Sequence, residues 1–208
     1  KLMASAKGVL HIINNYTGDK MSFDMGRELA EAEDIKIATT GGVNSQVGAG
    51  LGQQMFDDEA RAIVEAARLY GKKVAVHAHG ADGIKVALMA GVDSIEHGTM
   101  LDDECIALMV QAGTYYVPTL STVNGYIERL AANPGAYSPT VRAKVEWRIR
   151  VTGESLRKAV PKGVKIAFGT DAGVSKHGRN ADEFELMVKH GMTPASAFRP
   201  NSRHLSSR

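Results

Sequence analysis

The chain has 208 residues, of which 44% are hydrophobic, enough to bury the core of one large domain or two small ones. Its 25 basic and 23 acidic residues leave a net charge of +2. No dense stripe of Lys and Arg is interleaved with aromatic residues, so nucleic-acid binding is not indicated. No apolar run approaches the ~18 residues of a membrane span, and we expect no membrane partner.

Six short apolar runs predict β-strands because they are rich in β-branched residues and close on Gly or Pro. They cover residues 8–13, 35–40, 73–78, 92–96, 115–120 and 164–169. Helical patterns separate most of them, at 57–73, 80–91, 102–113, 140–163 and 180–191, and most end at Gly. Strand, helix, Gly, strand is typical of parallel βα units, in a barrel section or an open sheet.

Some local features add to this pattern. Asp57 is the expected N-cap of the helix at 57–73. The single cysteine, Cys105, cannot form an internal disulfide, and its helical setting favours a buried thiol over a reactive nucleophile. The Gly- and Gln-rich segment 43–56 is either a loop over an active-site face or a plain linker.

The two ends of the chain carry little pattern. The N-terminal segment lacks the apolar stretch and cleavage site of a signal peptide, which favours the cytoplasm. The native N-terminus can be missing from this sequence, and the location of the parent gene product stays open. Residues 1–197 are the expected folded domain, and residues 198–208 the expected disordered tail.

Three histidines follow strand-like runs. His77 and His79 are two residues apart in VAVHAHG, so their side chains point to the same face, and His97 closes the run SIEH. Because the carboxyl ends of parallel strands meet on one face, these side chains can surround one ion. A His-x-His pattern alone is weak. Its position after a buried strand favours metal ligands over satisfied core histidines.

Asp171 and Lys36 also stand at strand ends. Asp171 in FGTDAG, between two glycines, can bind a metal and accept a proton from metal-bound water; the alternative is an N-cap of the next helix. Lys36 is a ligand only if CO2 converts its amine to a carbamate, and alone it is a solvated strand end. Glu96 points away from His97, where it either orients a neighbouring group or meets solvent.

Five blocks in the same order resemble the metal-dependent amidohydrolase superfamily, in its branch of imidazolonepropionase-like proteins and Xaa-Pro dipeptidases. The blocks are DIKIATTGGV, residues 62–102, YYVPTLST, RKAVPKGVKIAFGTDAG and HGRNADEFELMVKHGMTP. The resemblance runs from about residue 33 to residue 197. It implies an α/β fold, a (β/α)8 TIM-type barrel with a metal centre at its carboxyl face.

The resemblance also implies roles for single residues. Lys36, His77, His97 and Asp171 match metal ligands of the fourth, fifth, sixth and eighth strands; the lysine is carboxylated, and the aspartate also serves as general base and acid. His79 matches a position near the substrate's carboxylate. Two further residues, Tyr16 and His177, are weaker candidates for substrate contact.

The chain also departs from the family pattern. No His-x-His pair of a first strand precedes Lys36, and the small β-sandwich of the family has no counterpart. Residues 2–19 resemble the third strand, with Asn14, Asn15 and Tyr16 where relatives carry Gly-Gly-His. We therefore expect a partial barrel of about strands three to eight. Its open edges favour a homo-oligomer.

These observations favour a metal-dependent hydrolase of amide or peptide C–N bonds in a small amide or dipeptide, through metal-activated water. The expected cofactor is one or two divalent ions, zinc first, with a possible carbamate on Lys36. An alternative is an inactive remnant of the family that binds metal or a partner without turnover. A third is a scaffold with buried histidines and no metal.

Overall fold

A computed structural model gives the structure of the protein, and it describes residues 3–4, 9–12, 34–46 and 50–198. The described strands form one sheet in the sequential order β1 to β7. The first pair, β1 and β2, is antiparallel, and all later pairs are parallel. Their bounds are β1 Met3–Ala4, β2 Val9–Ile12, β3 Asp34–Ala38, β4 Val74–Ala78, β5 Ser94–His97, β6 Tyr115–Val117 and β7 Lys165–Ile166. The six predicted strands are therefore present, in the predicted parallel arrangement.

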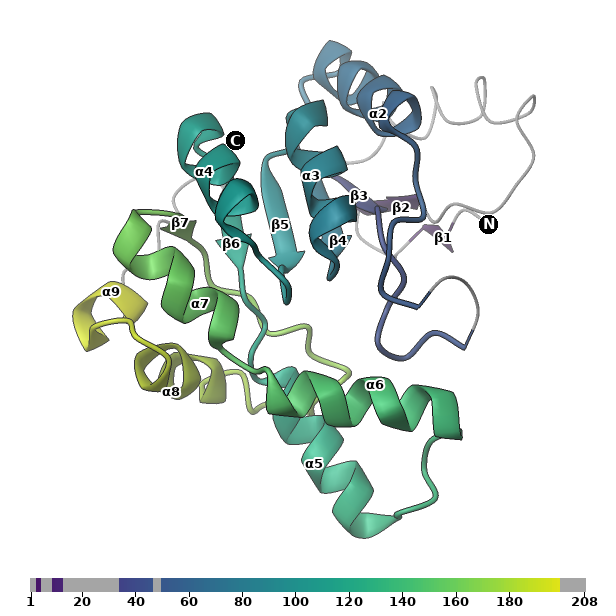
Figure 1. Ribbon diagram of the computed structural model, residues 1–208, viewed down its shortest axis with the longest axis vertical. Helices are drawn as coiled ribbons and strands as arrows, with labels where there is room; N and C mark the ends of the chain where they lie inside the picture. Colours follow the sequence, from purple (N-terminus) through teal and green to yellow (C-terminus); the bar gives the residue numbers. More distant parts are fainter. Residues whose placement is uncertain (1–2, 5–8, 13–33, 47–49, 199–208) are drawn as a thin grey trace.

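From β3 onward, helices follow the strands, and α2, α3 and α4 cover one face of the sheet (Figure 1). Three of them, α2, α3 and α4, follow β3, β4 and β5 in turn. The described helices are α2 Asp57–Leu69, α3 Ala81–Ala90, α4 Asp103–Ala112, α5 Thr122–Ala132, α6 Pro139–Arg150, α7 Glu154–Ala159, the 3-10 turn η1 Val160–Lys162, α8 Asp182–Lys189 and α9 Pro194–Phe198. None of the helices in this part of the chain is long and apolar enough to cross a membrane.

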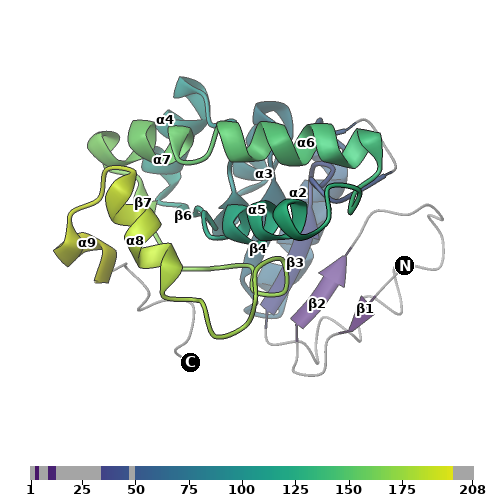
Figure 2. The same cartoon turned by 90° about the horizontal axis from the view of Figure 1, so that it is seen from below.

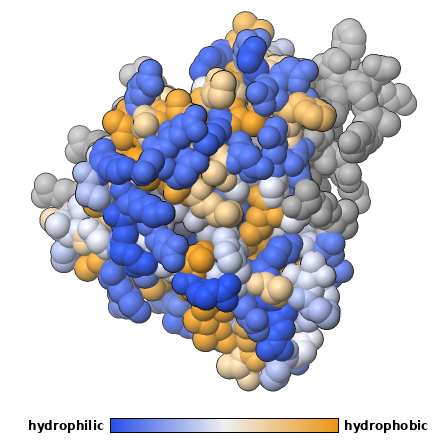
Figure 3. Space-filling view, in the orientation of Figure 1, coloured by the Kyte–Doolittle hydropathy of each residue, from blue (hydrophilic) through white to orange (hydrophobic). Residues whose placement is uncertain are grey.

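The main core lies between the sheet and these helices. The strand residues on this face, such as Ile35, Val76 and Ile95, are fully buried. Cys105 of α4 is buried among them, and burial raises the pKa of its thiol to about 12. The prediction of a core thiol is therefore confirmed. Figure 3 views the molecule from the same side as Figure 1, and on this surface polar and apolar residues are interspersed.

Three helix predictions need correction. The N-cap of α2 is Phe56, not Asp57, and the Phe56 N–H donates to the Glu59 carboxylate at 2.8 Å. The pattern at 140–163 is broken into α6, α7 and η1, because Gly153 adopts a positive φ of 78°. Helix α5 was not predicted: Gly125 weakens its helical pattern, yet it lets the helix approach the Val174 carbonyl, which a Cβ would meet at 2.2 Å.

Helices α5 and α6 pack side by side beyond the carboxyl ends of the strands, as Figures 1 and 2 show. Tyr126 of α5 and Val145 of α6 form a second small core with Val43 of the loop after β3. Lys144 of α6 also donates hydrogen bonds to the Gly42 and Ser45 carbonyls of this loop. In its described part, segment 43–56 is thus a loop over this face of the sheet, as one of the two alternatives predicted.

Candidate metal centre

Strand β4 carries two histidines to the carboxyl face of the sheet. Its burial alternates, with Val74, Val76 and Ala78 buried against the helices. His77 therefore points to the opposite face, and His79, two residues further, follows it. The His79 N–H donates to the Thr40 hydroxyl at 2.9 Å, which ties the end of β4 to the end of β3.

His97 reaches the same place from β5 by breaking the alternation of its strand. In the parallel register it lies beside Ala78, so alternation alone would turn its side chain toward the helices. Its φ is 70°, a left-handed value that is rare for residues other than Gly. The ring instead lies 4.5 Å from the His77 ring, measured between centroids.

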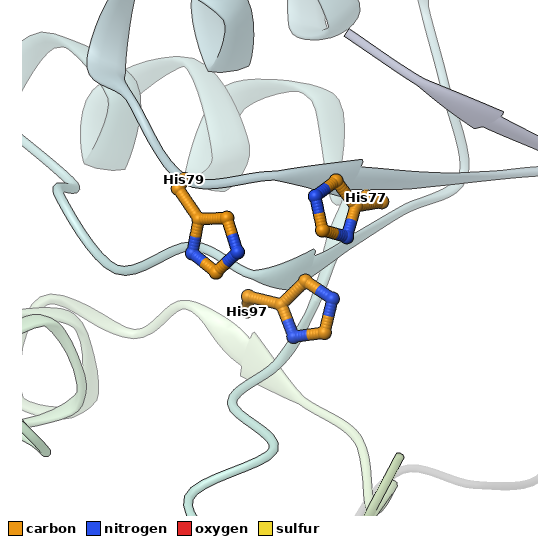
Figure 4. Close-up of side chains that lie close together, drawn as sticks. All are labelled: His77, His79 and His97. Carbon is orange, nitrogen blue, oxygen red and sulfur yellow. The ribbon is translucent and has the colours of Figure 1, made fainter. Parts of the chain in front are cut away.

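The three imidazole rings converge in Figure 4. His79 lies 4.9 Å from both His77 and His97 between ring centroids, and one ligand nitrogen from each ring lies within 4.8 Å of the others. The rings line a cavity of about 130 Å³. The rest of its wall is formed by Gly42, Val43, Asn44, Ser45, Thr122, Tyr126, Arg148 and Asp171.

Burial keeps the three imidazoles neutral. It lowers the pKa of His77 to about 4, with a further contribution from the Lys36 charge. The pKa values of His79 and His97 also lie well below the usual range, first because of burial and then because of the neighbouring His77. Neutral imidazole is the form that binds metal ions. The donor set therefore fits a divalent cation at neutral pH.

Two threonine hydroxyls hold the second ring nitrogens. His79 Nδ1 lies 2.8 Å from Thr99 Oγ1, and His97 Nδ1 lies 2.7 Å from Thr119 Oγ1. Metal-binding histidines generally have such a partner on the nitrogen that does not bind the metal. In both rings this leaves Nε2 without a bond to these hydroxyls.

Lys36 lies on β3, on the face opposite the buried Ile35 and Ile37. Its ammonium forms an ion pair with Glu96 of β5. The expectation that Glu96 points away from His97 is wrong, because Glu96 lies beside His77 in the register and therefore on the face that the His97 ring also reaches. Of the two alternatives for its contacts, pairing with a neighbouring group is observed. Neither side chain forms part of the cavity wall described above.

Asp171 follows β7 and lines the cavity. Partial burial raises the pKa of its carboxyl group, and the Lys36 charge opposes this shift. The alternative role as a helix N-cap is wrong, because the next helix, α8, begins only at Asp182 with Ala181 as its N-cap. Like His97, Asp171 has a positive φ, 51°, a kind of backbone strain that is often found at functional sites.

The remaining sequence candidates lie elsewhere. His177 is exposed in the loop before α8 and does not line the cavity. Tyr16 and residues 199–208 of the expected tail lie outside the described residues. Sequence reasoning missed Arg148, which is only 3% exposed and lines the cavity from α6, and Tyr126 from α5. In the sequence, Arg148 lies in a basic helix and carries no signal that separates it from solvated neighbours.

A family model described as the amidohydrolase family matches residues 20–201. The chain belongs to the amidohydrolase family. Ochratoxinase from Aspergillus niger is 33% identical over 169 residues, which cover 81% of this chain and 34% of that protein. The crystal structure of a Xaa-Pro dipeptidase with bound methionine in its active site superposes with a TM-score of 0.76 at 45% identity, over 83% of this chain and 44% of that one.

These relatives confirm the expected fold class, an α/β fold that forms part of an amidohydrolase barrel. The chain spans about a third to less than half of the relatives' length. One further match is short: 30 residues, 14% of this chain, are 63% identical to the dihydroxyacetone-binding subunit of a kinase from Lactococcus lactis. A match of this length carries no functional argument here.

Proposed function

We propose that this amidohydrolase cleaves an amide or peptide C–N bond of a small molecule, using a divalent metal held in the histidine-lined cavity by His77, His97 and Asp171. The observation that carries the proposal is the convergence of three neutral imidazoles in one cavity whose wall also contains Asp171. The family membership and the similarity to the Xaa-Pro dipeptidase support the same reaction class.

The proposed metal ligands are His77, His97 and Asp171, with Lys36 as a further ligand. Imidazole and carboxylate groups suit zinc, our first choice, and other first-row metals. When bound, such an ion polarises the scissile carbonyl and lowers the pKa of a water molecule. Lys36 would contribute only as a CO2-derived carbamate, and this carbamate must replace the present ion pair with Glu96.

Asp171 is the proposed general base and acid. Its carboxylate takes a proton from the attacking water and passes it to the leaving amine. The position of Asp171 in the wall of the cavity that the three histidines line supports the role. Asp171 has a left-handed backbone, and its side chain lines the cavity.

The proposed substrates are small amides and dipeptides, because the cavity is small and its wall includes the polar side chains of Asn44, Arg148 and Asp171. His79 is the proposed contact for a carboxylate of the substrate, and the buried positive charge of Arg148 adds to the attraction of an anionic group. His177 and Tyr16 remain weaker proposals. We also propose that the chain self-associates, with light scattering as the test.

The reaction is tested with zinc-loaded protein and a panel of dipeptides and N-acyl amino acids, by measuring amine release. We expect turnover by the wild type and a loss of about 10²-fold or more in kcat for Asp171→Asn. His177→Gln, at an exposed loop position, is the comparison variant with the weakest expected effect. Zinc binding without turnover of any substrate would instead support the inactive remnant.

A further inference from the structure

The segment Pro118–Ser121, between β6 and α5, passes directly beside the metal centre. Thr119, Leu120 and Ser121 are each at most 2% exposed. Thr119 has a φ of 47°, a left-handed value that a β-branched residue seldom adopts. Such a conformation persists only where the surroundings hold it in place.

Two buried charged side chains hold this segment through its backbone groups. The Glu183 carboxylate of α8 accepts hydrogen bonds from the Leu120 and Ser121 N–H groups at 2.9 and 2.7 Å. The Arg148 guanidinium of α6 donates to the Pro118 and Thr119 carbonyls, both at 3.4 Å.

Both charged side chains are almost completely buried, Glu183 at 0% and Arg148 at 3% exposed. In the described part of the chain no ion pair joins them. Burying two charges is costly unless their hydrogen bonds are satisfied. Here most of the hydrogen bonds of the two side chains are made to the backbone of residues 118–121, and these bonds fix the position of that segment.

The fixed position of Thr119 determines the protonation of the His97 ring. A hydroxyl has a single hydrogen, and Thr119 Oγ1 donates it to the Pro118 carbonyl at 2.8 Å. Its contact with His97 Nδ1 at 2.7 Å must then be one in which the ring nitrogen donates and the hydroxyl accepts. This arrangement favours the His97 tautomer that carries its proton on Nδ1, in which Nε2 keeps the free lone pair that a metal needs.

We propose that Thr119 is a positioning residue that fixes the tautomer and orientation of His97, and that Arg148 and Glu183 hold Thr119 in place for this purpose. The inference rests on the proposed function in so far as His97 binds the metal. The tautomer itself is a property of the metal-free protein and can be tested separately.

The test compares Thr119→Val, which keeps the shape and removes the hydroxyl, with Thr119→Ser, which keeps the hydroxyl. Thr114→Val is the matched control, because Thr114 is also buried and its hydroxyl donates to the Val92 carbonyl at 3.2 Å, away from the cavity wall. NMR of ¹⁵N-histidine-labelled, metal-free protein reports the tautomer of each ring. Competition with a chromophoric chelator reports the affinity for zinc alone.

We expect His97 to be the Nδ1–H tautomer in the wild type, Thr119→Ser and Thr114→Val, and to become a mixture in Thr119→Val. Zinc affinity should fall about 10- to 100-fold in Thr119→Val and return toward the wild-type value in Thr119→Ser. A smaller decrease in the same direction is expected for Glu183→Gln, which retains the side-chain shape. If Thr119→Val does not fold, Thr119→Ser and Glu183→Gln carry the comparison.

An unchanged tautomer in Thr119→Val would overturn the inference, and so would a changed tautomer with unchanged zinc affinity. If the wild type binds no zinc, the proposed function fails, and the NMR result alone then decides whether Thr119 positions His97. An equal loss of zinc affinity in Thr114→Val would show that any buried threonine hydroxyl matters equally, which contradicts a specific role.

Discussion

The neutral histidine cluster predicts that acid destabilises the metal-free protein, and His77→Gln isolates one part of this effect. Burial lowers the pKa of His77 from 6.5 to about 4 in the folded chain, so the unfolded chain binds more protons between these values. The contribution to stability is complete above pH ~6.5 and is lost as the pH falls toward the folded pKa. The free energy of unfolding must therefore decrease as the solution is acidified.

The size of the effect follows from the two pKa values. A shift of one unit corresponds to about 1.4 kcal/mol, so between pH 7 and pH 4.5 the His77 contribution is about 2 kcal/mol. His79 and His97 add to the loss in the wild type, because their pKa values are lowered in the same direction. Replacement of His77 by Gln removes the His77 contribution to this loss of stability. It also removes the repulsion that a protonated His77 exerts on protonated His79 and His97.

The assay is urea denaturation at both pH values in the presence of a chelator, so that metal binding does not contribute. Wild type should lose at least about 2 kcal/mol more than His77→Gln between pH 7 and pH 4.5. His177→Gln, at an exposed loop position, should lose as much as the wild type. Equal losses in wild type and His77→Gln would refute the claim that burial keeps His77 neutral.

Four further substitutions test the core and the loops beside the site. Gly125→Ala places a Cβ 2.2 Å from a backbone carbonyl oxygen, and we expect a loss of about 1–3 kcal/mol in the free energy of unfolding, measured in urea. Lys144→Met removes two hydrogen bonds to the loop after β3, so that KM for a cleaved dipeptide should rise more than kcat changes. Leu156→Ala, at a fully buried position, should cost about 2–5 kcal/mol, whereas Leu69→Ala, at 86% exposure, should stay within about 0.5 kcal/mol of wild type.

Each of these outcomes can fail in a recognisable way. Wild-type stability of Gly125→Ala would mean that α5 does not pack closely on the loop after β7. A drop in kcat with unchanged KM for Lys144→Met would place this lysine in the chemical step rather than in the loop anchor. Similar costs at the two leucine positions would contradict the described core.

The sheet was predictable because each strand is a short apolar run that ends at Gly, Pro or a polar residue. The order of strands and helices then follows from the regular alternation of strand and helix in parallel βα units. Helix α5 was not predictable in this way, since Gly125 is unfavourable in a helix and its benefit, the close approach to the Val174 carbonyl, exists only in the folded chain. The break at Gly153 depends on a positive φ that the helical pattern on both sides conceals.

The site was predictable to the extent that it depends on strand ends. His77 and His79 follow from the alternation of β4, and their proximity to His97 follows from the parallel register. The direction of the His97 ring does not follow from the strand pattern, because it depends on the left-handed backbone at that residue. Arg148 and Thr119 were missed for a related reason: their roles depend on partners that only the fold brings together.

The central claim is that the histidine cluster holds a metal ion, and the most direct test is the metal content of the purified protein. Elemental analysis should be carried out on wild type and on His77→Ala/His97→Ala, each before and after incubation with zinc and bicarbonate. We predict at least one equivalent of metal per wild-type chain and none in the double variant. A wild type that stays free of metal under both conditions, or a double variant that retains it, would contradict the account.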